Sequence, residues 1–131
     1  MTRSEIGGSE ASLTLLIVDD HDGFRSFARE LGSAAGFAVA GEAADGESAL
    51  KAAETLRPDV VLLDIQLPGM DGIEVARRLT ERPDAPVIVL TSTRDASEFG
   101  SRLSTSRATG FISKGELSPS RLAALVANGG P

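Results

Sequence analysis

Short runs of leucine, isoleucine and valine alternate along this chain with longer segments in which apolar residues recur every three or four positions. A continuous apolar run is typical of a strand buried on both faces, and the wider spacing is typical of an amphipathic helix. The pattern predicts five strands, at Leu13–Val18, Phe37–Ala43, Asp59–Leu63, Val87–Leu90 and Thr109–Ser113. It predicts a helix after each strand, at Asp22–Ala35, from Asp45 to Arg57, from Asp71 through Leu79, at Arg94–Ser106 and from Pro119 to Asn128.

Strand and helix therefore alternate five times without an insertion. This alternation predicts an α/β fold, in which helical crossovers cover both faces of a parallel five-stranded sheet. We expect the doubly wound (βα)5 arrangement with the flavodoxin-like strand order 2-1-3-4-5. The 131 residues fit one domain. We expect a flexible leader at residues 1–12, the domain at residues 13–128, and a tail or the start of a linker at residues 129–131.

Two of the predicted strands end directly in acidic residues, with Asp19 and Asp20 after the first strand and Asp64 after the third. In the order 2-1-3-4-5 these strands flank the switch point of the sheet, where ligands bind at the carboxyl ends. Carboxylates gathered there repel one another unless a cation joins them. Thr91 and Lys114 follow the fourth and fifth strands. The pattern therefore predicts a metal ion, the ammonium of Lys114, or both among the acids.

These side chains favour Mg²⁺ and phosphoryl chemistry. Mg²⁺ takes oxygen ligands, often one or two carboxylates with a phosphate, whereas Zn²⁺ prefers histidine and cysteine. A carboxylate can attack a phosphoryl group, and Mg²⁺ and Lys114 would neutralise the developing charge while the Thr91 hydroxyl donates to a phosphoryl oxygen. His21 adjoins the acidic pair and is the only histidine. We interpret it as a solvent-facing residue in the first turn of a helix.

The composition excludes several classes of protein. The net charge of −6 disfavours direct nucleic-acid binding, which needs clustered cations. The absence of cysteine excludes disulfides and thiolate metal sites. No apolar stretch approaches the roughly 20 residues of a membrane-spanning helix, and residues 1–12 lack the apolar core of a signal peptide. We expect a cytoplasmic protein that binds neither membrane nor nucleic acid directly.

Other residues have structural interpretations. Asp71, with Glu74 three residues later, has the pattern of a capping box, and Asp45 is a predicted helix cap. Three phenylalanines are expected in the hydrophobic core, namely Phe24, Phe27 and Phe37.

Four segments occur in a distinctive order and spacing, namely Val18–His21, Asp64–Gly72, Leu90-Thr91 and Gly110–Lys114. Together they resemble the receiver domain of two-component response regulators, the CheY-like fold, and the resemblance extends from about Leu13 to Ala127. The last segment, followed by Gly115 where many members have proline, looks more like the NarL/LuxR-type branch. Members of that branch often continue into a helix-turn-helix domain.

The resemblance implies a role for each acidic residue. Asp64 would accept a phosphoryl group from a sensor histidine kinase or a phosphotransfer protein. Asp20 and Asp64 would bind Mg²⁺ directly, with the backbone carbonyl of Gln66 as a third ligand. Asp19 would act mainly through a water molecule bound to the metal.

The resemblance also implies how phosphorylation is sensed. Lys114 would pair with the phosphoryl group, Thr91 would move toward it, and Phe111 matches the aromatic switch position, here without the hydroxyl of tyrosine. The surface formed by the fourth helix, fifth strand and fifth helix would carry the signal onward, for example as a homodimer interface.

Three other functions remain open. The chain would be the input half of a transcription factor if a helix-turn-helix domain followed it. A Mg²⁺-dependent phosphohydrolase with an aspartyl-phosphate intermediate is less favoured, because Gln66 stands where such enzymes usually carry a second aspartate. The third is a receiver-like module that is never phosphorylated, against which the acids, Thr91 and Lys114 argue.

Overall fold

The computed structural model describes residues 12–129, so most of the predicted leader and the end of the predicted tail lie outside the described residues. Five parallel strands form one sheet in the order β2-β1-β3-β4-β5. This is the predicted order, and the fold prediction is confirmed. The strands are β1 (Thr14–Val18), β2 (Ala38–Ala43), β3 (Val60–Asp64), β4 (Val87–Ser92) and β5 (Gly110–Ser113).

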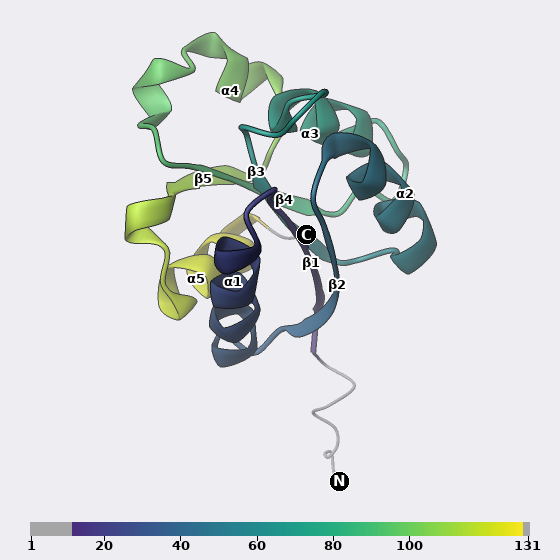
Figure 1. Cartoon of the computed structure of the whole chain (residues 1–131), viewed down its shortest axis with the longest axis vertical. Coiled ribbons are helices and arrows are strands. Elements are labelled where there is room, and N and C mark those ends of the chain that lie inside the picture. Colours follow the sequence, from purple (N-terminus) through teal and green to yellow (C-terminus); the bar gives the residue numbers. More distant parts are fainter. Residues whose placement is uncertain (1–11, 130–131) are drawn as a thin grey trace, which may run out of the picture.

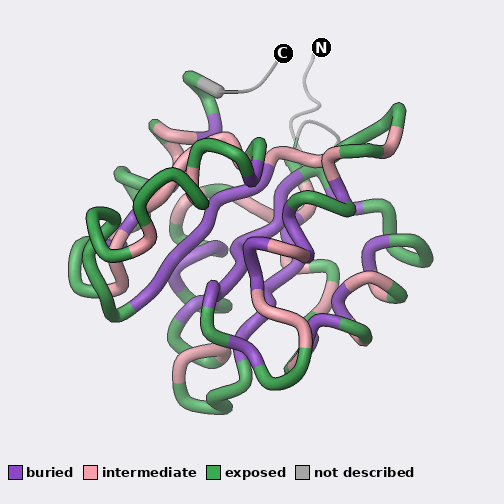
Figure 2. The backbone as a smooth tube through the Cα atoms, turned by 90° about the horizontal axis from the view of Figure 1, so that it is seen from above, coloured by how far each residue is buried: buried purple, intermediate pink, exposed green. Residues whose placement is uncertain are grey.

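Helices cover both faces of the sheet (Figure 1). On one face lie α1 (Asp22–Ala34) and α5 (Pro119–Gly129), and on the other lie α2 (Gly46–Leu56) and α3 (Gly72–Thr80). Side chains of successive residues of β1 point to opposite faces of the sheet, because side chains alternate along a strand. Leu15 and Ile17 join the core under α1 and α5, whereas Leu16 and Val18 join the core under α2 and α3. The buried backbone runs through the middle of the molecule in Figure 2.

Helix α3 begins directly beside the end of β3. A Cβ atom at Gly72 would lie 2.1 Å from the carbonyl oxygen of Asp64, so only glycine allows this approach. Asp71 caps the helix by accepting a hydrogen bond from the backbone N–H of Glu74. The reciprocal half of the predicted capping box is wrong, because the Glu74 carboxylate pairs with Arg77 and Arg78 instead.

The predicted fourth helix at Arg94–Ser106 is shorter and interrupted. One 3₁₀ turn, η3 (Ala96–Glu98), is followed by a five-residue helix, α4 (Ser101–Thr105). Gly100 separates them with a positive φ of 58°, and neither piece contains a buried residue. Only partly buried side chains such as Phe99 and Leu103 pack this segment against the core, so it has less of the tertiary packing that stabilises most helices.

The placement of Phe27 in the core is wrong, because 49% of this residue is exposed. The buried face of α1 runs through Ala28, Leu31 and Gly32. Gly32 faces Leu15 so closely that a Cβ atom there would lie 2.6 Å from the leucine side chain. The helix therefore approaches β1 through its glycine, whereas Phe27 is exposed. Phe24 and Phe37 are half-buried and pack against the core.

Candidate functional site

Two buried carboxylates and one lysine meet at the carboxyl edge of the sheet. Asp19 follows β1 and is 0% exposed, and Asp64 is the last residue of β3 and is 2% exposed. Lys114 follows β5, and its Nζ lies 2.6 Å from Asp19 Oδ2 and 3.5 Å from Asp64 Oδ2. The parallel register brings these side chains together from positions far apart in the sequence, as predicted from the strand ends.

The two carboxylates differ in their electrostatic surroundings. Burial and the negative charge of Asp19 together raise the pKa of Asp64 to about 6, against the opposing effect of Lys114. Burial also acts to raise the pKa of Asp19. Hydrogen bonds from Lys114 and from the backbone N–H of His21 outweigh it and hold that pKa below its ordinary value. One ammonium thus neutralises mainly one of the two buried acids.

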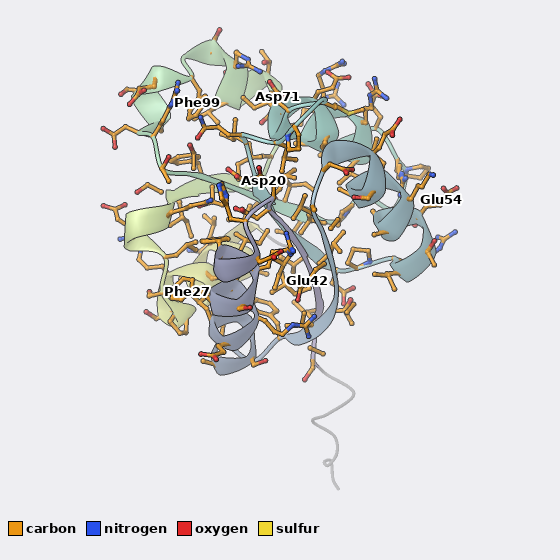
Figure 3. All side chains as sticks on the ribbon, in the orientation of Figure 1. Asp20, Phe27, Glu42, Glu54, Asp71 and Phe99 are labelled. Atoms are coloured by element: carbon orange, nitrogen blue, oxygen red, sulfur yellow. The ribbon has the colours of Figure 1, made fainter. Side chains whose placement is uncertain are left out.

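The loop after β1 adds an exposed carboxylate and an imidazole. Asp20 lies at the solvent side of the loop, where β1 leads into α1 (Figure 3). The side chain of His21 is 71% exposed, in agreement with the interpretation from the sequence. His21 is the N-cap residue of α1. Its Nδ1 nevertheless lies 3.1 Å from Asp19 Oδ1 and 3.0 Å from Asp20 Oδ1.

The loop after β3 is tied to the end of β4. The backbone N–H of Gln66 donates to Asp64 Oδ1 at 3.2 Å. The side chain of Gln66 accepts a hydrogen bond of 3.2 Å from the hydroxyl of Ser92, which is fully buried. Ser92 in turn accepts from the backbone N–H of Arg94. The carbonyl of Gln66 therefore belongs to a loop that is held at two points.

Thr91 lies beside Asp64 in the β3–β4 register, but its hydroxyl turns away from the acids. It is fully buried, and its Oγ1 donates to the carbonyl of Ile112 on β5 at 2.6 Å. Phe111, the neighbouring residue on β5, is half-buried, and its ring centroid lies 6.2 Å from that of Phe99. Thr91 and Phe111 are therefore both placed by the β4–β5 pair, and Phe111 lies beside Phe99, which follows η3.

The donor set fits a divalent cation. Asp19, Asp20, His21 and Asp64 each offer a ligand atom within 4.8 Å of the others. Lys114 offsets one negative charge among three carboxylates, and the pKa of Asp64 is raised by burial and by the nearby charge of Asp19. A bound Mg²⁺ would compensate the remaining charge through oxygen ligands.

Residues 15–127 match the family described as the response regulator receiver domain. The chain belongs to this family. It is 41% identical over 105 residues to the response regulator GacA of Pseudomonas aeruginosa, an alignment that spans 79% of this chain and 49% of GacA. It is 31% identical over 115 residues to the DNA-binding transcriptional activator EvgA of Escherichia coli K12, which spans 88% of this chain and 56% of EvgA. The resemblance seen in the sequence, including its NarL/LuxR-type character, is confirmed.

A solved structure supports the same assignment. The CheX–CheY–BeF₃–Mg²⁺ complex of Borrelia burgdorferi contains a chain that superimposes on this receiver domain with a TM-score of 0.78. The sequence identity is 26%, and the superposition covers 88% of this chain and 87% of the other. This receiver domain spans about half the length of the curated relatives it matches. In residues 12–129, no helix has the length and apolar character needed to cross a membrane.

One arginine beside the acidic site was not predicted from the sequence. Arg25, on the first turn of α1, donates to the backbone carbonyl of Asp19 at 2.6 Å and to Glu42 of β2 at 2.9 Å. It also pairs with Asp22. Arg25 therefore clamps the loop that carries the first two acids. The three-residue spacing of Asp22 and Arg25 was a visible signal, but the partner on β2 was not.

Lys114 has two further features that the sequence did not indicate. Its Nζ lies 4.2 Å from the ring centroid of Phe24, in a cation–π contact. With Gly115 it forms one 3₁₀ turn, η4 (Lys114–Glu116). The backbone after β5 therefore turns tightly where many family members carry proline, and Lys114 remains directed at the acids.

Proposed function

We propose that this receiver domain accepts a phosphoryl group on Asp64, in a Mg²⁺-dependent reaction, from a sensor histidine kinase or a phosphotransfer protein. One observation carries the proposal. Asp64 is a buried carboxylate whose pKa is raised to about 6, although Lys114 lies 3.5 Å away. The fold therefore holds an acid whose charge it leaves only partly compensated, at the edge of the sheet where this family's phosphate chemistry occurs.

The reaction is a phosphoryl transfer between two oxygens, or from nitrogen to oxygen. An oxygen of Asp64 forms a bond to phosphorus, the bond from phosphorus to the donor breaks, and the donor departs with the bonding electron pair. The product is an acyl phosphate on Asp64. Lys114 lies close enough to pair with the added charge, because its Nζ already approaches Asp64 Oδ2.

Mg²⁺, when bound, would neutralise charge on the transferring phosphoryl group. We assign its direct ligands to Asp20, Asp64 and the backbone carbonyl of Gln66, and a role through bound water to Asp19. The hydrogen bond between the Gln66 side chain and buried Ser92 supports this assignment, since it holds the loop that carries the carbonyl. The CheX–CheY complex in the comparison contains both BeF₃ and Mg²⁺.

We propose a switch at Thr91 and Phe111. To reach a phosphoryl oxygen, the Thr91 hydroxyl must leave the carbonyl of Ile112, to which it now donates. This change occurs between β4 and β5, next to Phe111 and to the α4 segment, which has no buried residue. Partner binding or homodimerisation through α4, β5 and α5 is the proposed output. The domain would act in the cytoplasm without contacting nucleic acid itself.

Acetyl phosphate with Mg²⁺ tests the proposal directly. Intact-mass spectrometry should detect one added phosphate on the wild-type protein, and removal of Mg²⁺ by EDTA should abolish it. Asp64→Asn should remove the added phosphate. Asp95→Asn is the matched control, because Asp95 is an exposed acid after β4 on the same edge of the sheet. Phosphate retained on Asp64→Asn would contradict the assignment.

The same experiment separates the alternatives. Repeated turnover of a phosphomonoester would favour a phosphohydrolase, and failure to bind Mg²⁺ at millimolar concentration would favour a module that is never phosphorylated. A role as the input half of a transcription factor is compatible with the proposed chemistry, since EvgA is a DNA-binding activator about half of which aligns with this chain.

A further inference from the structure

The aromatic ring of Phe24 lies against the ammonium of Lys114. The ring centroid is 4.2 Å from Lys114 Nζ, which is the distance of a close cation–π contact. Two carboxylates also lie near this atom, with Asp19 Oδ2 at 2.6 Å and Asp64 Oδ2 at 3.5 Å. Because the side chain of Lys114 is only 14% exposed, its ammonium interacts mainly with these neighbours and little with water.

Helix α1 holds the ring, and a different part of the chain carries the lysine. Phe24 lies in the first turn of α1, whereas Lys114 opens the 3₁₀ turn η4 after β5. The ring is half-buried and packs against the core under α1 and α5. Its centroid is also 5.9 Å from that of Phe27. The ring is therefore placed by contacts that do not involve Lys114.

A lysine needs such a contact if it is to stay directed at a reacting group. Its ammonium is a compact point charge at the end of a flexible four-carbon stem, without the fixed donor geometry of arginine. The ion pair with Asp19 restrains the ammonium through charge. The ring adds a second restraint that carries no net charge, so it leaves Lys114 able to pair with a phosphoryl group on Asp64.

We propose that Phe24 is a positioning residue for phosphoryl transfer, because its ring restricts the Lys114 ammonium to the place where it pairs with a phosphoryl group on Asp64. The inference rests on the proposed function and adds a residue of α1 to that site. Catalysis of phosphoryl transfer depends mainly on positioned charge. An ammonium that samples several positions stabilises the transition state less than one that is held, so loss of the ring should slow the reaction.

The rate of phosphorylation by acetyl phosphate with Mg²⁺ tests the inference. Phe24→Leu removes the ring but keeps an apolar side chain, and we expect it to react about three- to tenfold more slowly than the wild-type protein. Phe24→Met also lacks a ring and should be similarly slow. Phe24→Tyr keeps the ring and should retain most of the wild-type rate.

Phe27→Leu is the matched control for the loss of a phenylalanine from α1. Phe27 lies beside Phe24 on the same helix, but 49% of the residue is exposed. We therefore expect Phe27→Leu to react at the wild-type rate.

The mobility of the lysine separates positioning from a general structural role. The chain has two lysines, Lys51 and Lys114, so the substitution Lys51→Arg assigns their ammonium resonances in nuclear magnetic resonance spectra. We expect the order parameter of the Lys114 ammonium to fall in Phe24→Leu and to stay at its wild-type value in Phe24→Tyr. The Mg²⁺ affinity of Phe24→Leu should not fall, because the proposed ligands of Mg²⁺ are oxygen atoms of other residues.

Four results would overturn the inference and leave the proposed function standing. They are a wild-type rate in Phe24→Leu, a Phe24→Tyr variant as slow as Phe24→Leu, a Lys114 ammonium that stays equally ordered without the ring, and a loss of Mg²⁺ affinity that matches the loss of rate. A wild-type protein that takes up no phosphate would overturn the proposed function, and this inference with it.

Discussion

Asp19 and Asp64 end two neighbouring strands, are both buried, and share one lysine, yet the fold treats their charges differently. Asp19 is 2.6 Å from Lys114 and accepts hydrogen bonds from His21, so its pKa is lowered although burial acts to raise it. Asp64 is 3.5 Å from Lys114, and burial together with repulsion from Asp19 raises its pKa to about 6.

The difference separates an acid whose charge the protein compensates from one whose charge it compensates only in part. Asp19 holds Lys114 in place, and the ammonium of Lys114 compensates most of the charge of Asp19. Asp64 is left with a charge that a cation or a phosphoryl group with its metal would stabilise better than the protein alone. The following variants test this difference, from the largest expected effect to the smallest.

Lys114→Met should have the largest effect on stability. It leaves both buried carboxylates without their ammonium, and loss of one partner from a buried ion pair costs about 3–5 kcal/mol. Urea unfolding in EDTA, followed by far-ultraviolet circular dichroism because the chain has no tryptophan or tyrosine, measures the loss.

Asp19→Asn is the matched control for this variant. It also breaks the close pair, but it removes the repulsion on Asp64 and leaves Lys114 within 3.5 Å of that remaining acid. We expect a smaller loss, about 1–3 kcal/mol. Equal losses for the two variants would mean that Lys114 does not stabilise Asp64, against the shared arrangement described above.

Asp64→Asn should have the opposite sign and should stabilise the metal-free domain. The pKa of Asp64 rises from an ordinary 3.8 to about 6 on folding. Its contribution to stability is therefore complete below pH 3.8 and is lost as the pH rises through about 6. Replacing it should raise the free energy of unfolding by about 1–2 kcal/mol at pH 8 and by little at pH 4.

Urea unfolding at a series of pH values in EDTA measures this difference. The lowered pKa of Asp19 has the opposite effect on the free energy of unfolding. The stability that the Asp19 charge contributes is present at neutral pH and is lost as the pH falls through the lowered pKa. The two titrations are therefore separated along the pH axis. A stabilisation by Asp64→Asn that is the same at pH 4 and pH 8 would show that the charge of Asp64 is not its source.

The sequence predicted the positions of these acids because they interrupt apolar runs. Four consecutive apolar residues before Asp19 and before Asp64 indicate buried strands, and the parallel order then brings the strand ends together. The same argument placed Thr91 and Lys114 at this edge. The unequal treatment of the two carboxylates was not predictable, because it depends on a difference between 2.6 and 3.5 Å.

Predictions failed where the apolar pattern was weak or admitted two alignments. The segment around α4 combines Gly100 with many serines and threonines, so it carried little information on where a helix begins and ends. In α1 the apolar spacing included Phe27, whereas the strand packs against Gly32, a residue that contributes nothing to a hydrophobic pattern. Arg25 was missed because its partner Glu42 comes from another strand.

Arg25→Met should have the smallest effect, and it tests the contacts through which Arg25 holds the loop after β1. Arg25 donates to the carbonyl of Asp19 and to Glu42, and its side chain is 16% exposed. Arg29→Met is the matched control, because Arg29 also pairs with Glu42 but is not bonded to Asp19. We expect Arg25→Met to cost about 1 kcal/mol more than Arg29→Met in urea unfolding, since a charge-assisted hydrogen bond to a carbonyl is lost.

The clamp should also affect the two strand ends unequally. In Arg25→Met, backbone amide resonances of Asp20 and His21 should shift, because the loop after β1 is released, whereas those of Gln66 and Gly72 should stay near their wild-type positions. Mg²⁺ affinity should fall about two- to fivefold, since Asp20 becomes less well positioned while Asp64 is unchanged. Equal shifts in both loops would mean that the loops after β1 and β3 move together. Asp19 and Asp64 would then differ only in how their charges are compensated.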